Sequence, residues 1–83
     1  MTEEARNAEL LEIWLVRQVR EKKGNNLTVG TTRKMGPNPL RNSKKLEDVL
    51  ELLVDLGRIR ITQAQGTKKR YIEVAPAVIK EWS

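Results

Sequence analysis

The sequence has 83 residues, of which 39% are hydrophobic and 33% are charged, and its 16 basic and 11 acidic side chains leave a net charge of +5. This length and composition predict one folded domain over residues 1–83, and they argue against disorder. No apolar run approaches the roughly 18 residues that a membrane span requires, so we expect no membrane partner. The chain lacks cysteine, which excludes disulfides and agrees with the cytoplasmic location that we expect, and it lacks histidine, which removes the commonest general base and most transition-metal sites.

The N-terminal part of the chain predicts a long helix. Thr2 suits an N-cap, and Glu3 and Glu4 place negative charge at the positive end of the helix dipole. We expect the helix to run for about twenty residues, to near Gly24.

The apolar residues of this helix form two groups on a helical wheel. The first group comprises Ala8, Leu11, Trp14, Leu15 and Val19, and the second comprises Leu10, Ile13 and Val16. If only one face of the helix packed against the core, the second group would be exposed to solvent. Another element is therefore expected to pack against this group. We expect a short C-terminal helix that begins at Pro76 and carries Val78, Ile79 and Trp82 to lie on it, and the alternative is a dimer interface or a docking surface.

The segment between residues 27 and 41 predicts short elements. Residues 27–29 suffice for a very short strand, and Thr31 or Thr32 suits the N-cap of a short helix through residues 33–35. Gly-Pro-Asn-Pro at 36–39 predicts a rigid, non-helical connection, because proline restricts the residue before it and cannot continue a helix. We expect Leu40 to anchor this connection in the core.

The strongest periodic signal lies between Ser43 and Leu56, where apolar residues follow the spacing of one helical face. Asn42 and Ser43 suit the N-cap, and Gly57 suits a left-handed C-cap. The residues expected on the buried face are Leu46, Val49, Leu50, Leu53, Val54 and Leu56.

After Gly57 the hydrophobic period changes to two. Residues 58–62 and 70–74 alternate as half-buried strands do, and the polar interval 63–69 separates them, so we expect an antiparallel hairpin with 27–29 as a third strand. The whole order predicts an α+β fold, a small winged helix-turn-helix domain whose wing is the 63–69 loop. The connection between its second and third helices is longer than the usual three or four residues.

Three motifs in this order carry a more specific resemblance. They are the run 33–41 (Arg-Lys-Met-Gly-Pro-Asn-Pro-Leu-Arg), Leu-Gly-Arg-Ile-Arg at 56–60, and Lys-Arg-Tyr at 69–71. Over roughly residues 8–75 the chain resembles the C-terminal winged-helix domain of prophage- and plasmid-type primase/helicase-like proteins. The resemblance implies an appended domain of a larger replication-type protein, with the catalytic and nucleotide-binding parts outside this sequence.

Most of the basic residues fall in two windows without acidic residues, 31–45 and 58–70. A polyanion is the natural partner of such windows, and a winged helix suggests double-stranded DNA. The residues expected to contact DNA are Arg33, Lys34, Arg41, Asn42, Lys44, Lys45, Lys68, Lys69 and Arg70. Arg58 and Arg60 either join this set or cover the sheet with their stems.

The third helix complicates this expectation. Its polar face carries Lys44 but also four carboxylates, at Glu47, Asp48, Glu51 and Asp55, which would repel phosphates. We therefore expect only the N-terminal end of the helix to approach DNA, where free amides and the helix dipole favour a phosphate.

No catalytic constellation is present. Neither Gly24 nor Gly30 opens a phosphate-binding loop of the Gly-Lys-Ser/Thr type, and the adjacent carboxylates suit solvated helix surfaces. We expect no enzyme activity, no cofactor and no metal, but a DNA-binding module with weak sequence preference that holds backbone phosphates.

Three alternatives stay open. In the first, the domain is a protein-interaction module that uses the Leu10 side of the first helix or the acidic face of the third helix. In the second, the basic residues are ordinary surface charge. In the third, the domain is a stand-alone transcription regulator. The last needs a dimerisation element that the sequence does not reveal.

Overall fold

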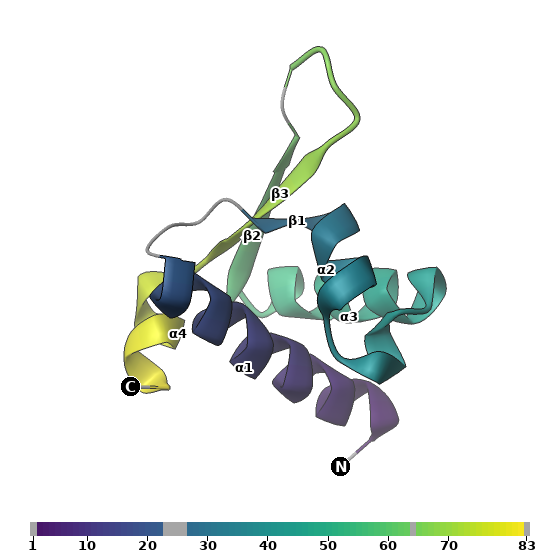
Figure 1. The fold of residues 1–83 in the computed structure, drawn as a ribbon. Coiled ribbons are helices and arrows are strands. Elements are labelled where there is room, and N and C mark those ends of the chain that lie inside the picture. The colour runs from purple at the N-terminus through teal and green to yellow at the C-terminus, as the bar shows by residue number, and fades with distance from the viewer. Residues whose placement is uncertain (1, 23–26, 64, 83) are drawn as a thin grey trace.

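The structure is a computed structural model that describes residues 2–22, 27–63 and 65–82. Four α-helices, one 3-10 turn and three strands alternate along this part of the chain (Figure 1). In chain order they are α1 (Glu3–Lys22), β1 (Leu27–Thr28), α2 (Val29–Met35), η1 (Asn38–Leu40), α3 (Ser43–Asp55), β2 (Ile59–Gln63), β3 (Arg70–Val74) and α4 (Pro76–Glu81). The predicted winged-helix fold is confirmed. The predicted end of the first helix, near Gly24, lies outside the described residues.

Helix α3 begins and ends where its caps predict. The Oδ1 atom of Asn42 accepts hydrogen bonds from the amides of Lys44 at 3.0 Å and Lys45 at 3.2 Å, and Gly57 follows the helix with φ +72°. Four apolar residues of the expected face are buried: Leu46, Val49, Leu50 and Leu53.

Two residues expected on that buried face are not in the core. Val54 is 41% exposed and Leu56 is 62% exposed. Val54 lies at the border of the apolar face, and Leu56 is the C-cap residue, where the chain already turns away from the helix. Helical periodicity therefore predicted the burial correctly at the centre of the apolar face, but not at its border or at the C-cap.

The sheet has the order β1-β3-β2, with β3 in the centre and both pairings antiparallel. β2 pairs with β3 from Ile59 opposite Val74 to Gln63 opposite Arg70, so the hairpin that the alternation predicted is present. Leu27 lies opposite Ile72, which confirms the expected third strand.

Helix α2 starts earlier than predicted. Thr28, rather than Thr31 or Thr32, is the N-cap, and its Oγ1 atom accepts from the Thr31 amide at 3.1 Å. Thr32 donates its hydroxyl to the Thr28 carbonyl at 2.9 Å. Val29 consequently belongs to the helix and not to the strand, because the hydroxyl bonds of these threonines stabilise a helical turn immediately after β1.

The connection after α2 is tighter than predicted. The expected non-helical segment 36–39 contains the start of the 3-10 turn, and Leu40, at its end, is fully buried as expected. Gly36 precedes this turn at a crowded position, because a Cβ atom there would lie 2.4 Å from the Thr32 carbonyl oxygen. A side chain at residue 36 would therefore displace α2 from the turn that leads to α3.

Helix α4 packs on α1, as the wheel predicted, beside the C-terminal end of α1 in Figure 1. The contact centres on Glu12, a buried carboxylate. Trp82 Nε1 donates to it at 3.1 Å and Arg58 Nε at 2.8 Å, while Arg58 Nη2 also bonds Glu81 at 2.8 Å. Val16 is buried, whereas Leu10, from the same group on the wheel, stays 41% exposed.

The hairpin extends away from the helices, and its tip forms the wing (Figure 1). The three helices α1, α2 and α3 lie together at the base of the hairpin, where the core residues of the sheet, such as Ile72, are completely buried. Within the described residues, no helix combines the length and the apolar character that a membrane crossing requires.

Candidate nucleic-acid interface

A groove lies between α2 and the wing, with a volume of about 690 Å³. Ten residues line the groove, and five of them are basic while no lining residue is acidic. The lining residues are Thr28, Val29, Gly30, Thr31, Arg33, Lys34, Thr67, Lys68, Lys69 and Arg70. We call this feature the basic groove. It brings together residues of the two basic windows of the sequence, which most of α3 separates along the chain.

The topology of the sheet forms the basic groove. β1 pairs with the central strand β3, and α2 follows β1 without a connecting loop, so α2 is placed beside the hairpin. Two hydrogen bonds within the wing stabilise its conformation. Gln63 Nε2 donates to the Thr67 carbonyl and the Lys69 amide donates to the Thr67 hydroxyl, both at 3.3 Å. Gly66 has φ +77°, a conformation that favours glycine.

The start of α3 adjoins the basic groove. Arg33 Nη1 donates to the Ser43 hydroxyl at 3.3 Å and thereby ties α2 to the first turn of α3. Lys44 is exposed in the same turn. Arg33 therefore connects the basic groove to the start of α3.

One carboxylate meets the edge of this surface. Glu47 of α3 forms an ion pair with Arg70 through two hydrogen bonds, one between Arg70 Nη1 and Glu47 Oε2 at 3.2 Å and the other between Nη2 and Oε1. The hydrogen bond from Arg70, together with the positive charges of Arg70 and Arg33, holds the pKa of the Glu47 carboxyl below its ordinary value. Glu47 is accordingly an anion at neutral pH.

Three of the predicted contact residues are engaged elsewhere. Arg41 Nε donates to the Gly36 carbonyl at 3.3 Å, and Asn42 caps α3. Lys45 pairs with Glu3 at 3.3 Å, next to α1 rather than in the basic groove. The α3 amides that we expected to be free for a phosphate include those of Lys44 and Lys45, and Asn42 already satisfies both.

The remaining carboxylates of α3 gather on the side towards α1. Asp48, Glu51 and Asp55 line one hollow together with Glu4 and Leu52. The expectation that acidic residues cover much of the polar face of this helix is confirmed. Among the described residues, Glu47 is the one of the four carboxylates that forms an ion pair with β3. Cations thus line the basic groove between α2 and the wing, whereas three carboxylates of α3 and Glu4 of α1 line a separate acidic hollow.

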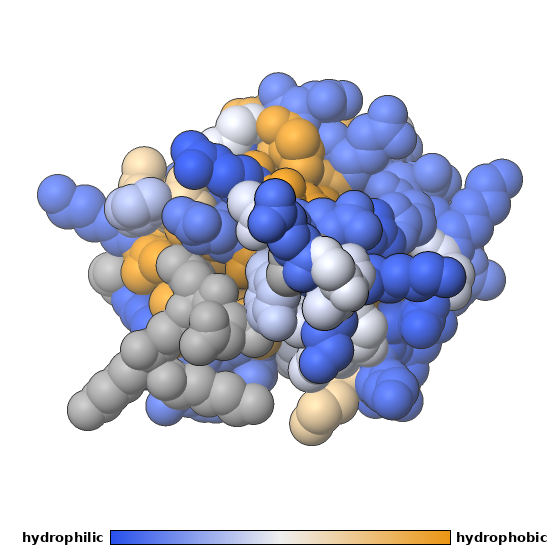
Figure 2. Space-filling model, turned by 90° about the horizontal axis from the view of Figure 1, so that it is seen from above, coloured by the Kyte–Doolittle hydropathy of each residue, from blue (hydrophilic) through white to orange (hydrophobic). Residues whose placement is uncertain are grey.

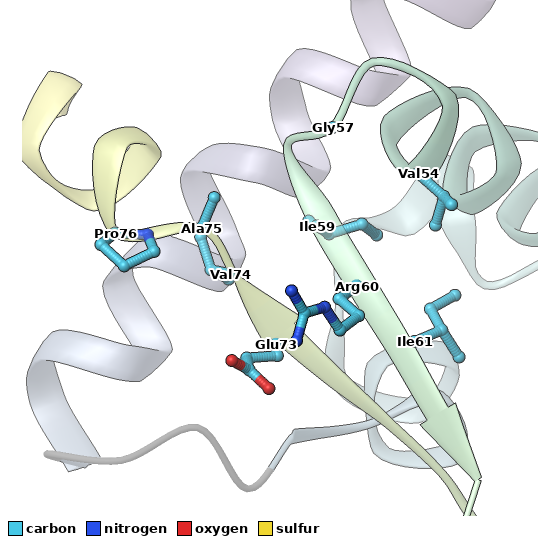
Figure 3. A pocket seen from close by; sticks show the side chains of 9 residues that line it. All are labelled: Val54, Gly57, Ile59, Arg60, Ile61, Glu73, Val74, Ala75 and Pro76. Carbon is cyan, nitrogen blue, oxygen red and sulfur yellow. The ribbon is translucent and has the colours of Figure 1, made fainter.

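Arg58 and Arg60 do not join the basic groove. Arg58 is half-buried against Glu12, and Arg60 lies at the other edge of the sheet, in a hollow beside β2 (Figure 3). Figure 3 shows its side chain next to that of Glu73, its cross-strand partner, with Val54 and Pro76 on either side.

Several residues of the basic groove were not among the contact residues predicted from the sequence. Thr28, Gly30, Thr31 and Thr67 line it with small side chains, and three of them carry hydroxyl groups. Their positions beside a helix start and a glycine turn were visible in the sequence, but only the pairing of β1 with β3 places them opposite the wing. Viewed from the wing side, the surface is mostly hydrophilic, with smaller apolar areas (Figure 2).

The comparisons with known proteins agree with this fold. No curated protein and no solved structure matched the chain. The family model of the YfjI-like C-terminal winged helix domain matches residues 6–73, a span that includes the wing, the basic groove and all of the sheet except Val74. The chain therefore belongs to the YfjI-like C-terminal winged helix domain family.

Proposed function

We propose that this domain binds double-stranded DNA through backbone phosphates, without catalysis, and that the basic groove is the contact surface. The observation that carries the proposal is the meeting of Arg33 and Lys34 with Lys68, Lys69 and Arg70 in one groove without an acidic lining residue. A surface of this charge attracts a polyanion at long range, and it releases condensed counterions when it binds a duplex.

The acidic part of α3 limits how the duplex lies. Asp48, Glu51 and Asp55 lie beyond the first turn of α3, so full insertion of this helix into the major groove would press carboxylates against phosphates. The duplex instead lies against α2, the wing and the first turn of α3, where Lys44 is exposed. Contacts of this kind position a duplex but carry little sequence information.

The parent protein is part of the same proposal. The family description gives this domain as C-terminal, which supports a module appended to a larger protein. We propose a cytoplasmic replication protein of the primase/helicase type, of prophage or plasmid origin, as that parent, and the domain then holds duplex DNA near the site where the parent acts.

A salt titration of duplex binding tests the proposal. Fluorescence anisotropy of a labelled random-sequence duplex should show that log K falls against log salt with a slope of about −4 to −5, if about five phosphates are neutralised. Single strands of the same length should bind more weakly, because the proposed surface offers cations rather than aromatic stacking platforms. A slope near zero would defeat the proposal.

A matched pair of double variants locates the surface. Lys68→Ala with Lys69→Ala should weaken duplex binding about tenfold at low salt and reduce the slope by about two. Arg17→Ala with Arg20→Ala removes the same charge from exposed positions on α1 and should change affinity less than about twofold. Equal losses in both variants would show that net charge alone, and not the basic groove, governs binding.

A protein-binding module is the second candidate, and one observation favours it. The exposed side chains of Val54 and Leu56 lie at the end of α3, and Val54 borders the hollow beside β2. Exposed apolar side chains of this kind support a protein partner when they form a continuous patch. If the duplex does not bind at low salt, this surface becomes the leading candidate.

A further inference from the structure

Arg70 differs from its neighbours in the basic groove because a carboxylate already holds it. Glu47 makes two hydrogen bonds to its guanidinium, and the exposed fractions of the two side chains are 48% for Glu47 and 38% for Arg70. Lys68 and Lys69, by contrast, are exposed residues of the wing for which no ion pair is seen within the described residues. The pair thus lies at the rim of the groove, accessible to a ligand from solvent.

We propose that Glu47 sets the strength of duplex binding, because it occupies in the free protein the place on Arg70 that a backbone phosphate takes in the complex. The inference rests on the proposed DNA-binding function and names a residue that tunes it. Glu47 would act as an internal competitor of the phosphate.

The chemistry of the two anions supports such an exchange. A carboxylate and a phosphate both present two oxygens that the planar guanidinium fork binds in the same bidentate manner. Because both partners are substantially solvent-exposed, their separation does not leave a buried, unpaired charge. The exchange of the carboxylate for a phosphate therefore costs only the free energy of one surface ion pair.

Glu47 also keeps a cationic neighbour when Arg70 turns to a phosphate. Arg33 is close enough to contribute to the lowered pKa of Glu47, and it donates to Ser43, one helical turn before Glu47 on α3. The carboxylate stays charged across the neutral range, so the competition does not depend on a change of pH.

The test is a duplex titration with Glu47→Gln, which keeps the shape of the side chain but removes its charge. Duplex affinity should rise about twofold to fivefold, the equivalent of one exposed ion pair. The salt slope should change little, because a phosphate replaces Glu47 on Arg70 in the wild-type complex as well. A thermal melt of the variant confirms that it is folded.

Glu51→Gln is the matched control. Glu51 lies one turn further along α3, carries the same charge and is exposed, but it lines the acidic hollow with Asp48 and Asp55. This variant should change affinity less than about twofold and leave the slope unaltered. An equal gain from both variants would overturn the inference, since it would reduce the effect to net charge.

A double variant isolates the route through Arg70. In a protein that carries Arg70→Ala, the further change Glu47→Gln should gain little, because the site of competition is gone. Retention of the full gain in that background would also overturn the inference. If the wild type binds duplex and Glu47→Gln does not alter the affinity, only this inference fails; if neither protein binds, the proposed function fails with it.

Discussion

Among the ion pairs of the described residues, one arginine–glutamate pair connects α1 to the hairpin and another connects α3 to it, and the two differ in burial. Arg58, just before β2, pairs with Glu12 of α1, and Arg70, the first residue of β3, pairs with Glu47 of α3. The Glu12 side chain is 7% exposed, whereas that of Glu47 is 48% exposed. The same chemical groups thus occur once in the interior and once on the candidate interface.

Burial decides what such an ion pair does. The Glu12 side chain is buried where α1 meets β2 and α4, and its carboxylate accepts from both Arg58 and Trp82, so removal of its charge weakens both hydrogen bonds at once. Hydrogen bonds from Arg58 to Glu12 and then to Glu81 raise the pKa of the Arg58 guanidinium above its ordinary value. The Glu47 pair has solvent as an alternative partner and is free to exchange.

The largest expected effect is the loss of stability on Glu12→Gln. The substitution should lower the free energy of unfolding by about 2–3 kcal/mol, because it weakens charged hydrogen bonds in a buried site. In a domain of this size the midpoint of thermal unfolding should then fall by roughly 10–20 °C. Urea unfolding followed by circular dichroism measures the change directly.

Glu9→Gln is the matched control, at an exposed position on the same helix. It should change the free energy of unfolding by less than about 0.5 kcal/mol. If Glu9→Gln and Glu12→Gln were equally stable, the Glu12–Arg58 pair would contribute no more to stability than a surface contact does.

The second prediction separates the two arginines. Arg70→Ala should weaken duplex binding by up to about fivefold, less than the loss expected for the two wing lysines, because Glu47 already offsets part of its charge. Its stability should change by less than about 1 kcal/mol. Arg58→Ala should do the reverse, with a loss of stability and, at temperatures where the variant is folded, unchanged duplex affinity.

Anisotropy titrations and urea unfolding of both arginine variants provide the two readouts. A loss of duplex affinity in the folded Arg58→Ala protein would contradict the assignment of Arg58 to the interior. A large loss of stability in Arg70→Ala would contradict the assignment of Arg70 to the interface.

The smallest expected effect is a pH dependence of the Glu47 pair. Its folded-state pKa lies below the unfolded value, so the pair stabilises the fold above the unfolded pKa, and this contribution disappears as the pH falls through the folded pKa. At neutral pH the wild type should be more stable than Glu47→Gln by less than about 1 kcal/mol, and the difference should approach zero in acid. Unfolding midpoints of both proteins across a pH series measure it.

Glu51→Gln again supplies the reference in this series, because Glu51 lies in the acidic hollow and not against Arg70. Its difference from the wild type should not follow the same acid profile. A Glu47 difference that grew as the pH fell would have the wrong sign for an ion pair and would contradict the proposed contact.

Local signals predicted most of the fold. The caps of α3, the alternation at 70–74 and Pro76 at the start of α4 all mark their elements correctly, since capping, strand period and proline geometry act over a few residues. Errors arose where the local signals compete. Thr28, Thr31 and Thr32 are each able to cap a helix, and the sequence alone does not say that Thr28 is the one that does so.

The candidate site was predicted only in part. The sequence indicated two basic windows, and the structure brings Arg33 and Lys34 together with the wing in the basic groove. It places Lys45 in an ion pair with Glu3, however, and uses Asn42 as a cap. Their roles in nucleic-acid binding stay predictions.

By itself, the sequence determined the order of the elements, the basic charge and the hydrophobic face of α3, because each depends on residues that are close along the chain. Only the tertiary structure decided which charges meet. Glu47 and Arg70 are separated by 23 positions, Glu12 and Arg58 by 46, and Glu12 and Trp82 by 70. Contacts over such separations follow from how α1 and α3 pack beneath the hairpin, and no local rule specifies them.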